Sequence, residues 1–276
     1  MQRRFKAAIA GLLWVAASMA VAGPSCSPGM LPVNGHGLWV DHQAGAQPTL
    51  VFEAGGGNDA TVWSRFLEQA KPLGLSTFVY DRAGLGNSEV DPSPYTVQRE
   101  VAALAAALEA CEVKGDLILV AHSYGGNIAL LLAAQHRQVK GVVLLDTVIP
   151  GYNTAERIQK ILDTYRPQYP EIREKAPKLA AAVIPMMEAY PDTAKALDAV
   201  SLPPGLPVVD IVAEKPAVDT PEEAATWHAA HRAFVQKDTS RSYVLAKDSG
   251  HKVMVDRPDL VLRAIETLLQ RITVQP

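Results

Sequence analysis

The chain has 276 residues and a formal net charge of −3. A slightly acidic balance excludes a typical nucleic-acid-binding protein, which carries clustered basic charge. The length fits one large α/β domain.

The first residues have the pattern of a secretory signal peptide. A basic start at residues 3–6 precedes an apolar run over residues 7–21, and Ala20-Val21-Ala22 is a small-x-small cleavage site. The run is shorter than the 18 or more residues of a typical membrane-spanning helix. We therefore expect residues 1–22 to be removed, the protein to be periplasmic or secreted, and the mature chain not to insert stably into a membrane. An uncleaved anchor is the alternative, and a lipoprotein modified at Cys26 is a weaker one, because residues 21–25 lack the Leu that lipidation needs.

The mature chain, residues 23–276, contains two cysteines. Cleavage would remove three basic residues and change the net charge from −3 to −6. Cys26 and Cys111 would then meet an oxidising compartment, where a disulfide can form. Their spacing resembles no metal site, so a disulfide and two unpaired thiols remain the alternatives.

Short β-branched runs alternate with helical patterns along the mature chain. Strands are expected at residues 37–43 (an antiparallel edge), 49–53, 76–80, 116–121, 141–146, 207–213 and 242–246. Helices are expected at residues 60–71, 95–111, 126–136, 221–237 and 258–272. This alternation predicts an α/β fold with a doubly wound, mostly parallel sheet. Ligands bind such sheets beyond the carboxyl ends of the strands.

Residues 150–205 interrupt the alternation. This segment contains helical patterns at residues 158–165, 178–187 and 193–200 with no strand between them. It is too long for a plain connection. We therefore expect a helical cap inserted after the sixth strand, covering the carboxyl edge of the sheet, and the alternative is a solvated decoration without a role in binding.

Ser123 lies between the strand at residues 116–121 and the following helix. A turn this tight demands very small residues two positions to each side, and Ala121 and Gly125 meet that demand in an A-x-S-x-G variant of the nucleophile elbow. Ser123 is therefore a candidate nucleophile, and simple helix capping by its hydroxyl is the alternative.

A glycine loop over residues 54–58 follows an earlier strand and reaches the same edge of the sheet. Backbone amides in such a loop can approach a substrate oxygen without side-chain obstruction. The amides of Gly56 and Tyr124 are therefore predicted to form an oxyanion hole. A turn that only reverses the chain is the alternative.

Of the seven histidines, His251 alone follows the last expected strand and precedes the final helix. The chain order of serine before histidine suits a nucleophile-elbow fold. We predict that His251 is the general base, and that His122 is a packed or hydrogen-bonded neighbour of the nucleophile.

These motifs together resemble the α/β-hydrolase superfamily, in its serine-nucleophile branch with a helical cap. The motifs are Glu53-Ala54-Gly55-Gly56-Gly57, Tyr80-Asp81-Arg82-Ala83-Gly84-Leu85-Gly86-Asn87-Ser88, Ala121-His122-Ser123-Tyr124-Gly125-Gly126 and Ser249-Gly250-His251. The resemblance covers nearly all the mature chain and implies a hydrolase, often of esters, that needs no cofactor and no metal.

The sequence offers three candidates for the triad acid. Many relatives place an Asp after the strand at residues 207–213, but proline stands at the expected position here, and Asp219 or Glu214 would have to substitute. In haloalkane dehalogenases and some lipases, the acid follows the sixth strand instead, where this chain has Asp146. We predict Asp146, ahead of Asp219 and then Glu214.

The expected function is therefore hydrolysis of carboxylic esters of small or medium size through an acyl-enzyme on Ser123. The alternatives are an aminopeptidase-like amide hydrolase, a cofactor-free C–C hydrolase or haloperoxidase, and an exported binding protein with a degenerate site. A dehalogenase or epoxide hydrolase is disfavoured, because these need a carboxylate at the nucleophile position.

The sequence predicts a small-molecule acyl substrate and does not indicate the oligomeric state. Candidate pocket residues, which could equally be core, are Tyr165, Tyr169, Met186, Met187 and Trp227.

Overall fold

The computed structural model describes residue 26 and residues 28–274. The expected signal peptide, residues 1–22, lies outside the described residues. Within the described part, no helix is both long and apolar enough to cross a bilayer.

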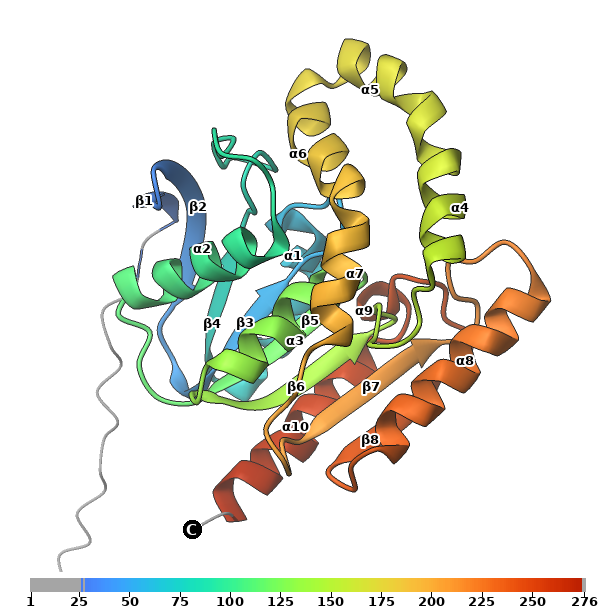
Figure 1. Ribbon diagram of the computed structural model, residues 1–276. Helices are drawn as coiled ribbons and strands as arrows, with labels where there is room; N and C mark the ends of the chain where they lie inside the picture. The colour runs from blue at the N-terminus through green and yellow to red at the C-terminus, as the bar shows by residue number, and fades with distance from the viewer. Residues whose placement is uncertain (1–25, 27, 275–276) are drawn as a thin grey trace, which may run out of the picture.

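The described residues form one eight-stranded sheet with the order β1-β2-β4-β3-β5-β6-β7-β8 (Figure 1). The first two pairings, β1 with β2 and β2 with β4, are antiparallel, and the rest are parallel. The strands are β1 (Gly29–Val33), β2 (His36–Gln43), β3 (Ala46–Glu53), β4 (Leu75–Tyr80), β5 (Leu117–His122), β6 (Val139–Leu145), β7 (Val208–Ala213) and β8 (Arg241–Ala246). The predicted mostly parallel α/β sheet is confirmed, and β1 is an additional edge strand.

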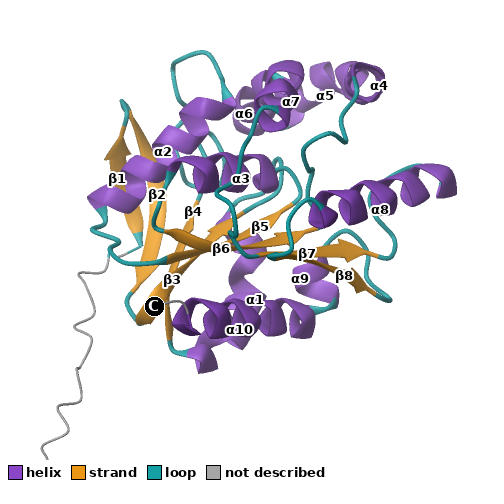
Figure 2. Cartoon of the chain, turned by 60° about the horizontal axis from the view of Figure 1, so that its bottom comes forward, coloured by secondary structure: helices purple, strands orange, loops and turns teal. Residues whose placement is uncertain are grey.

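Helices cover both faces of the sheet (Figure 2). On one face lie α2 (Val97–Ala110), α3 (Gly125–Gln135) and α8 (Pro221–Gln236), and on the other lie α1 (Ser64–Ala70), α9 (Val253–Asp256) and α10 (Pro258–Val274). Strand β5 is apolar from Leu117 to Ala121 because its side chains pack into layers on both faces of the sheet. Leu117 and Leu119 pack into the first layer, whereas Ile118 and Val120 pack into the second, so every residue of a central strand is buried.

Four helices between β6 and β7 form the predicted cap, and they stand over the carboxyl edge of the sheet (Figure 1). They are α4 (Ala155–Tyr165), α5 (Tyr169–Lys175), α6 (Pro177–Glu188) and α7 (Tyr190–Asp198). Helix α5 was not predicted. It has only seven residues, and a short 3₁₀ segment that contains Pro167 precedes it, so its periodicity is too brief to recognise.

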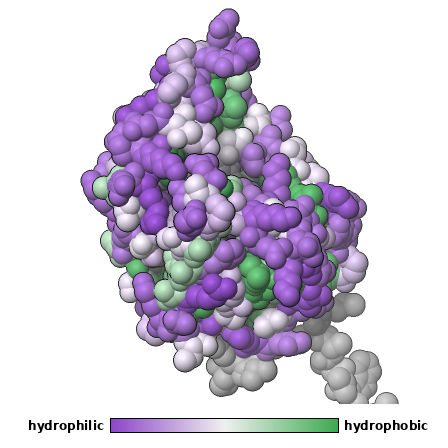
Figure 3. Space-filling view, turned by 90° about the vertical axis from the view of Figure 1, so that its right-hand side faces the viewer, coloured by the Kyte–Doolittle hydropathy of each residue, from purple (hydrophilic) through white to green (hydrophobic). Residues whose placement is uncertain are grey.

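Helix α4 is amphipathic, with Ile158 and Leu162 buried and Glu156 and Lys160 exposed. The side of the molecule that carries α4 and α8 is mostly hydrophilic, with apolar surface in separate patches (Figure 3). The cap therefore turns its polar residues toward solvent and its apolar residues inward, as a packed helix does.

Cys26 and Cys111 form a disulfide with a Cα–Cα distance of 5.4 Å. The bond ties the segment before β1 to the residue that follows α2. Of the two alternatives left open by the sequence, the structure contains the disulfide.

Candidate active site

Ser123 occupies a sharp turn between β5 and α3 with a φ of +54°. Non-glycine residues rarely adopt this left-handed conformation. The space around the turn explains the small neighbours, because a Cβ added to Gly125 would lie 2.6 Å from the carbonyl oxygen of Ala54. Ala121 is fully buried. The local geometry is that of a nucleophile elbow, and it presents the serine at the carboxyl edge of the sheet.

His251 reaches Ser123 from the loop after β8. Its Nε2 atom lies 2.9 Å from Ser123 Oγ, and its Nδ1 atom lies 2.7 Å from Asp146 Oδ2. The three side chains, separated by up to 128 residues in sequence, thus form one hydrogen-bonded chain. The Asp146 side chain is fully buried, whereas that of His251 is 31% exposed. The imidazole is therefore more accessible to a substrate than the carboxylate is.

Asp146 directly follows β6 and is held by two further donors. The indole N–H of Trp227 and the backbone amide of Ala213 both donate to Oδ1, at 2.8 and 3.2 Å. Its other oxygen, Oδ2, is free to accept from His251. These donors keep the carboxylate in one orientation.

The other two candidate acids do not contact the imidazole. Asp219 lies on the surface and forms an ion pair with Lys160 at 3.2 Å, and Glu214 accepts a hydrogen bond from the backbone of Asp248. Of the three carboxylates, the structure brings only Asp146 to His251.

His122 supports the loop that carries His251. Its Nε2 atom lies 3.0 Å from the carbonyl oxygen of His251, so Nε2 carries the hydrogen of this bond. Burial, followed by the neighbouring His251, lowers the pKa of His122 to about 4. His122 is therefore neutral at neutral pH, and it is a hydrogen-bonded residue next to Ser123, as the sequence predicted.

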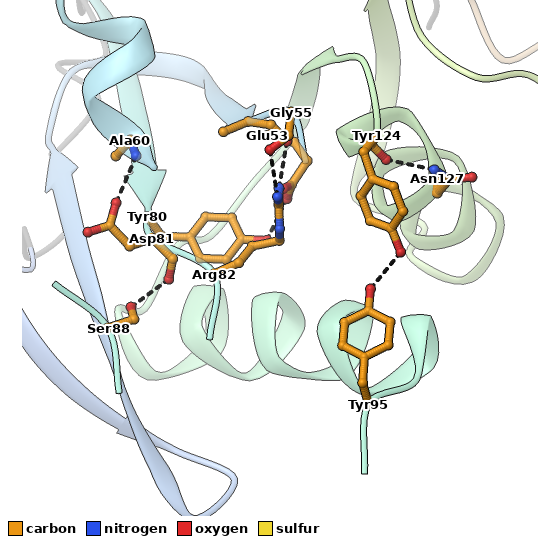
Figure 4. Close-up of polar contacts among 11 residues, drawn as sticks. Glu53, Gly55, Ala60, Tyr80, Asp81, Arg82, Ser88, Tyr95, Tyr124 and Asn127 are labelled. Carbon is orange, nitrogen blue, oxygen red and sulfur yellow. Dashed lines mark hydrogen bonds and ion pairs between the residues drawn. The ribbon is translucent and has the colours of Figure 1, made fainter. Parts of the chain in front are cut away.

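The side chain of Arg82 is hydrogen-bonded to the backbone of the glycine loop (Figure 4). Its guanidinium donates to the carbonyl oxygens of Ala54 and Gly55 and forms a 2.7 Å ion pair with Glu53, and both side chains of this pair are 2% exposed. The hydroxyl of Tyr80 also donates to Glu53. Arg82 belongs to one of the motifs found in the sequence, but its contacts to the glycine loop were not predicted, because they join residues 27 to 29 positions apart.

The contact with Gly55 also orients the next amide. In a planar trans peptide, the C=O of one residue and the N–H of the next point in opposite directions. Because the Gly55 carbonyl points to Arg82, the N–H of Gly56 points away from it. Gly56 itself lies beside Tyr124, whose Cβ would be 3.4 Å from a Cβ added to this glycine. The two predicted oxyanion-hole residues are therefore neighbours.

A cavity of about 330 Å³ lies between the core and the cap, and Ser123 and His251 are among its lining residues. Of the five candidate pocket residues, Tyr165 and Trp227 line this cavity. Met186 lies near Gly56. Tyr169 instead packs inside the cap, where Met187 lies against the same cluster.

Comparisons with known proteins agree with this architecture. The model of the alpha/beta hydrolase family matches residues 50–264, which is most of the chain. The chain belongs to the α/β-hydrolase family.

Individual relatives of this hydrolase are distant. The uncharacterized protein YqjL of Bacillus subtilis (strain 168) is 24% identical over 249 residues, which cover 84% of this chain and 88% of that protein. A thermophilic esterase from Thermogutta terrifontis has a TM-score of 0.64 at 20% identity, covering 90% of this chain and 99% of that chain. The enol-lactonase from Burkholderia xenovorans LB400 has a TM-score of 0.60 at 20% identity, covering 88% and 100%. At these identities the solved structures show a shared fold, and activity must be argued from the site.

Proposed function

We propose that this α/β hydrolase is an exported serine hydrolase that cleaves carboxylic esters of small or medium size. The observation that carries the proposal is the hydrogen-bonded chain from Ser123 Oγ through His251 to Asp146. Serine is a weak nucleophile until a base accepts its proton, and this arrangement supplies an oriented base.

The proposed reaction has two halves. His251 Nε2 takes the proton of Ser123 while Oγ attacks the ester carbonyl carbon, and the imidazolium then gives that proton to the departing alkoxide oxygen. Water next attacks the acyl-serine carbonyl, again losing a proton to Nε2, and the Ser123 oxygen recovers a proton as the acid leaves. Asp146 stabilises the imidazolium and keeps Nδ1 protonated throughout.

The proposed oxyanion hole consists of the amides of Gly56 and Tyr124. The proximity of these residues and the orientation of the Gly55–Gly56 peptide by Arg82 support this assignment. Pre-oriented donors are effective because they need no reorganisation when charge develops on the carbonyl oxygen.

The cavity favours small or medium substrates and an ester over an amine-bearing peptide. Its volume of about 330 Å³ is near the lower end for ligand pockets. Its two acidic residues outside the triad, Asp219 and Glu223, both pair with Lys160. Neither is therefore a free partner for the amino group of a peptide substrate.

Two observations support export. The sequence begins with a signal-peptide pattern, and the structure contains a disulfide, a bond typical of oxidising compartments. Cell fractionation of the tagged full-length chain, with N-terminal sequencing of the mature protein, tests this part. Cytoplasmic retention with an intact N-terminus would reject it.

The ester assignment is tested with p-nitrophenyl esters of increasing acyl length beside aminoacyl anilides. We expect turnover of short esters and a loss of several orders of magnitude in Ser123→Ala and His251→Ala. Ser64→Ala, which changes an exposed serine at the start of α1, is the matched control and should retain full activity. Faster cleavage of anilides would favour the amidase, and turnover that survives Ser123→Ala would reject the proposed nucleophile.

A further inference from the structure

The cavity that contains Ser123 also carries two cationic residues of the cap helix α4, Arg157 and Lys160. Charged groups that line a small cavity influence which substrates enter it. The two residues differ in whether a carboxylate of the protein already neutralises them.

Lys160 forms ion pairs with two carboxylates. Its ammonium lies 2.5 Å from Glu223 Oε1 and 3.2 Å from Asp219 Oδ2. Two carboxylates surround this single cation, so Lys160 offers no net positive charge to a ligand.

Arg157 is not neutralised. Its side chain donates one hydrogen bond, from Nη1 to the carbonyl oxygen of Tyr152 at 2.7 Å. The guanidinium lies over the Tyr152 ring, 4.6 Å from the ring centroid. Within the described residues no carboxylate pairs with it. A guanidinium carries five N–H donors, so most of its donors remain available.

The contacts of Arg157 also restrict its movement. The hydrogen bond fixes one edge of the guanidinium, and the ring of Tyr152 supports its face. Tyr152 is itself held edge-to-face against Trp227, at a centroid distance of 4.6 Å, and Trp227 donates to Asp146. The cation is thus attached to the same group of side chains that orients the proposed triad.

We propose that Arg157 binds a carboxylate on the substrate, and that the preferred esters of this enzyme are therefore monoesters of dicarboxylic acids or similar carboxylate-bearing esters. The inference rests on the proposed function and adds the substrate class. A planar guanidinium binds a carboxylate through two parallel hydrogen bonds, which gives both affinity and orientation. The aromatic and aliphatic lining would hold the carbon chain between the carboxylate and the ester, and this lining includes Val148, Ile161, Tyr165 and Tyr190.

The test compares esters that differ only in charge. Monomethyl glutarate, adipate and suberate are each paired with the neutral methyl ester in which a methyl ketone replaces the free carboxylate. Acid release is followed by pH-stat titration. We expect the wild type to prefer the charged ester for at least one chain length, and Arg157→Gln to lower the charged-to-neutral ratio of kcat/KM by about 10- to 100-fold.

Two further variants distinguish a specific carboxylate-binding site at Arg157 from non-specific electrostatic attraction of the substrate. Arg157→Lys keeps the charge but loses the planar fork, so it should retain part of the preference. Arg166 follows the last residue of α4, pairs with Glu188 and does not line the cavity. Arg166→Gln removes this cation and should therefore leave the charged-to-neutral ratio unchanged. The proposal is overturned if the wild type shows no preference, if Arg157→Gln leaves the ratio intact, or if Arg166→Gln lowers it equally.

Calorimetry with monomethyl adipate distinguishes this inference from the proposed function. Ser123→Ala protein should bind the compound, and adding Arg157→Gln should weaken binding about 10- to 100-fold. Binding that depends on Arg157 without turnover of any ester would support the carboxylate site and reject the esterase. Turnover of neutral esters that depends on Ser123, with no role for Arg157, would support the esterase and reject the carboxylate site.

Discussion

Asp146 and Asp219 both line the cavity that contains Ser123, yet their surroundings support different proposed roles. Asp146 is fully buried and bonded to the imidazole, whereas the side chain of Asp219 is 77% exposed and paired with Lys160. Only a carboxylate in contact with His251 can orient the ring and stabilise its charged form.

We predict that Asp146→Asn lowers kcat for ester hydrolysis by about 10³- to 10⁴-fold, because an amide would favour the wrong imidazole tautomer. Asp219→Asn is the matched control and should change kcat by less than about threefold, since an exposed ion pair contributes little. Steady-state kinetics on a p-nitrophenyl ester measures both. The reverse ranking would assign the acid to Asp219.

At the residue scale, the candidate site residues that lie in short local motifs could be predicted from the sequence. Ser123 could be located from its small neighbours, and His251 from its place after the last strand. The donation from Trp227 to Asp146 joins residues 81 positions apart, and the bond from His122 to the His251 carbonyl joins residues 129 apart. No local pattern encodes such pairs, because they depend on how the finished sheet and helices pack.

At the element scale, the glycine loop depends on a buried ion pair between the last residue of β3 and the segment that follows β4. Arg82 follows β4 and bonds to the loop that follows β3. We predict that Arg82→Lys lowers kcat by about 10-fold or more with little change in KM, because misaligned oxyanion donors affect the transition state selectively. Lysine keeps a charge beside Glu53 and so limits the cost of an unpaired buried carboxylate.

The matched control for Arg82→Lys is Arg99→Lys. Arg99 lies on α2 and pairs with the partly exposed Asp91, so its substitution should leave kcat unchanged. A fall in thermal stability of Arg82→Lys without any fall in kcat would show that the ion pair serves only the fold.

Helix α2 carries Glu100, which is 8% exposed. Burial, partly offset by Arg82, raises the pKa of Glu100 from 4.5 to about 7. The folded state then holds a proton that the unfolded state releases above pH 4.5, so this group's contribution to stability is lost as pH rises from 4.5 to 7.

We predict that the stability of the wild type relative to Glu100→Gln falls by about 3 kcal/mol between pH 4.5 and pH 7 and then levels off. Urea denaturation of both proteins across this range measures the difference. A difference that is constant with pH would show that Glu100 has the same pKa in the folded and unfolded states.

The elements themselves could largely be predicted from the sequence, with specific exceptions. Buried parallel strands have mostly apolar sequences, so β3 to β7 were recognisable, and the half-buried edge strand β8 was recognisable from its run Tyr243-Val244-Leu245-Ala246. Strand β1 reads GMLPV and lies at the sheet edge with alternating burial, so its five residues carry a weak signal. The cap could be inferred from the lack of strands, but the ion pairs of Lys160 could not, because they depend on how α4 lies against α8 and the loop before it.

At the scale of the whole molecule, the disulfide closes a loop between residues 85 positions apart in sequence. A cross-link of this span stabilises the fold mainly by restricting the unfolded chain. We predict that Cys26→Ser/Cys111→Ser lowers the free energy of unfolding by about 2–4 kcal/mol, with kcat unchanged because neither cysteine lines the catalytic cavity. Urea denaturation with and without reductant measures the effect, and equal stability of the two proteins would contradict it.

We propose that the fold activates the Ser123 hydroxyl through His251. The most direct test of this proposal is to treat the protein with an organophosphonate that labels activated serines and to locate the adduct by peptide mass spectrometry. We predict one stoichiometric adduct on Ser123, none on the Ser123→Ala protein, and labelling slowed by orders of magnitude in His251→Ala. An adduct on a different residue, or undiminished labelling of Ser123→Ala, would contradict it.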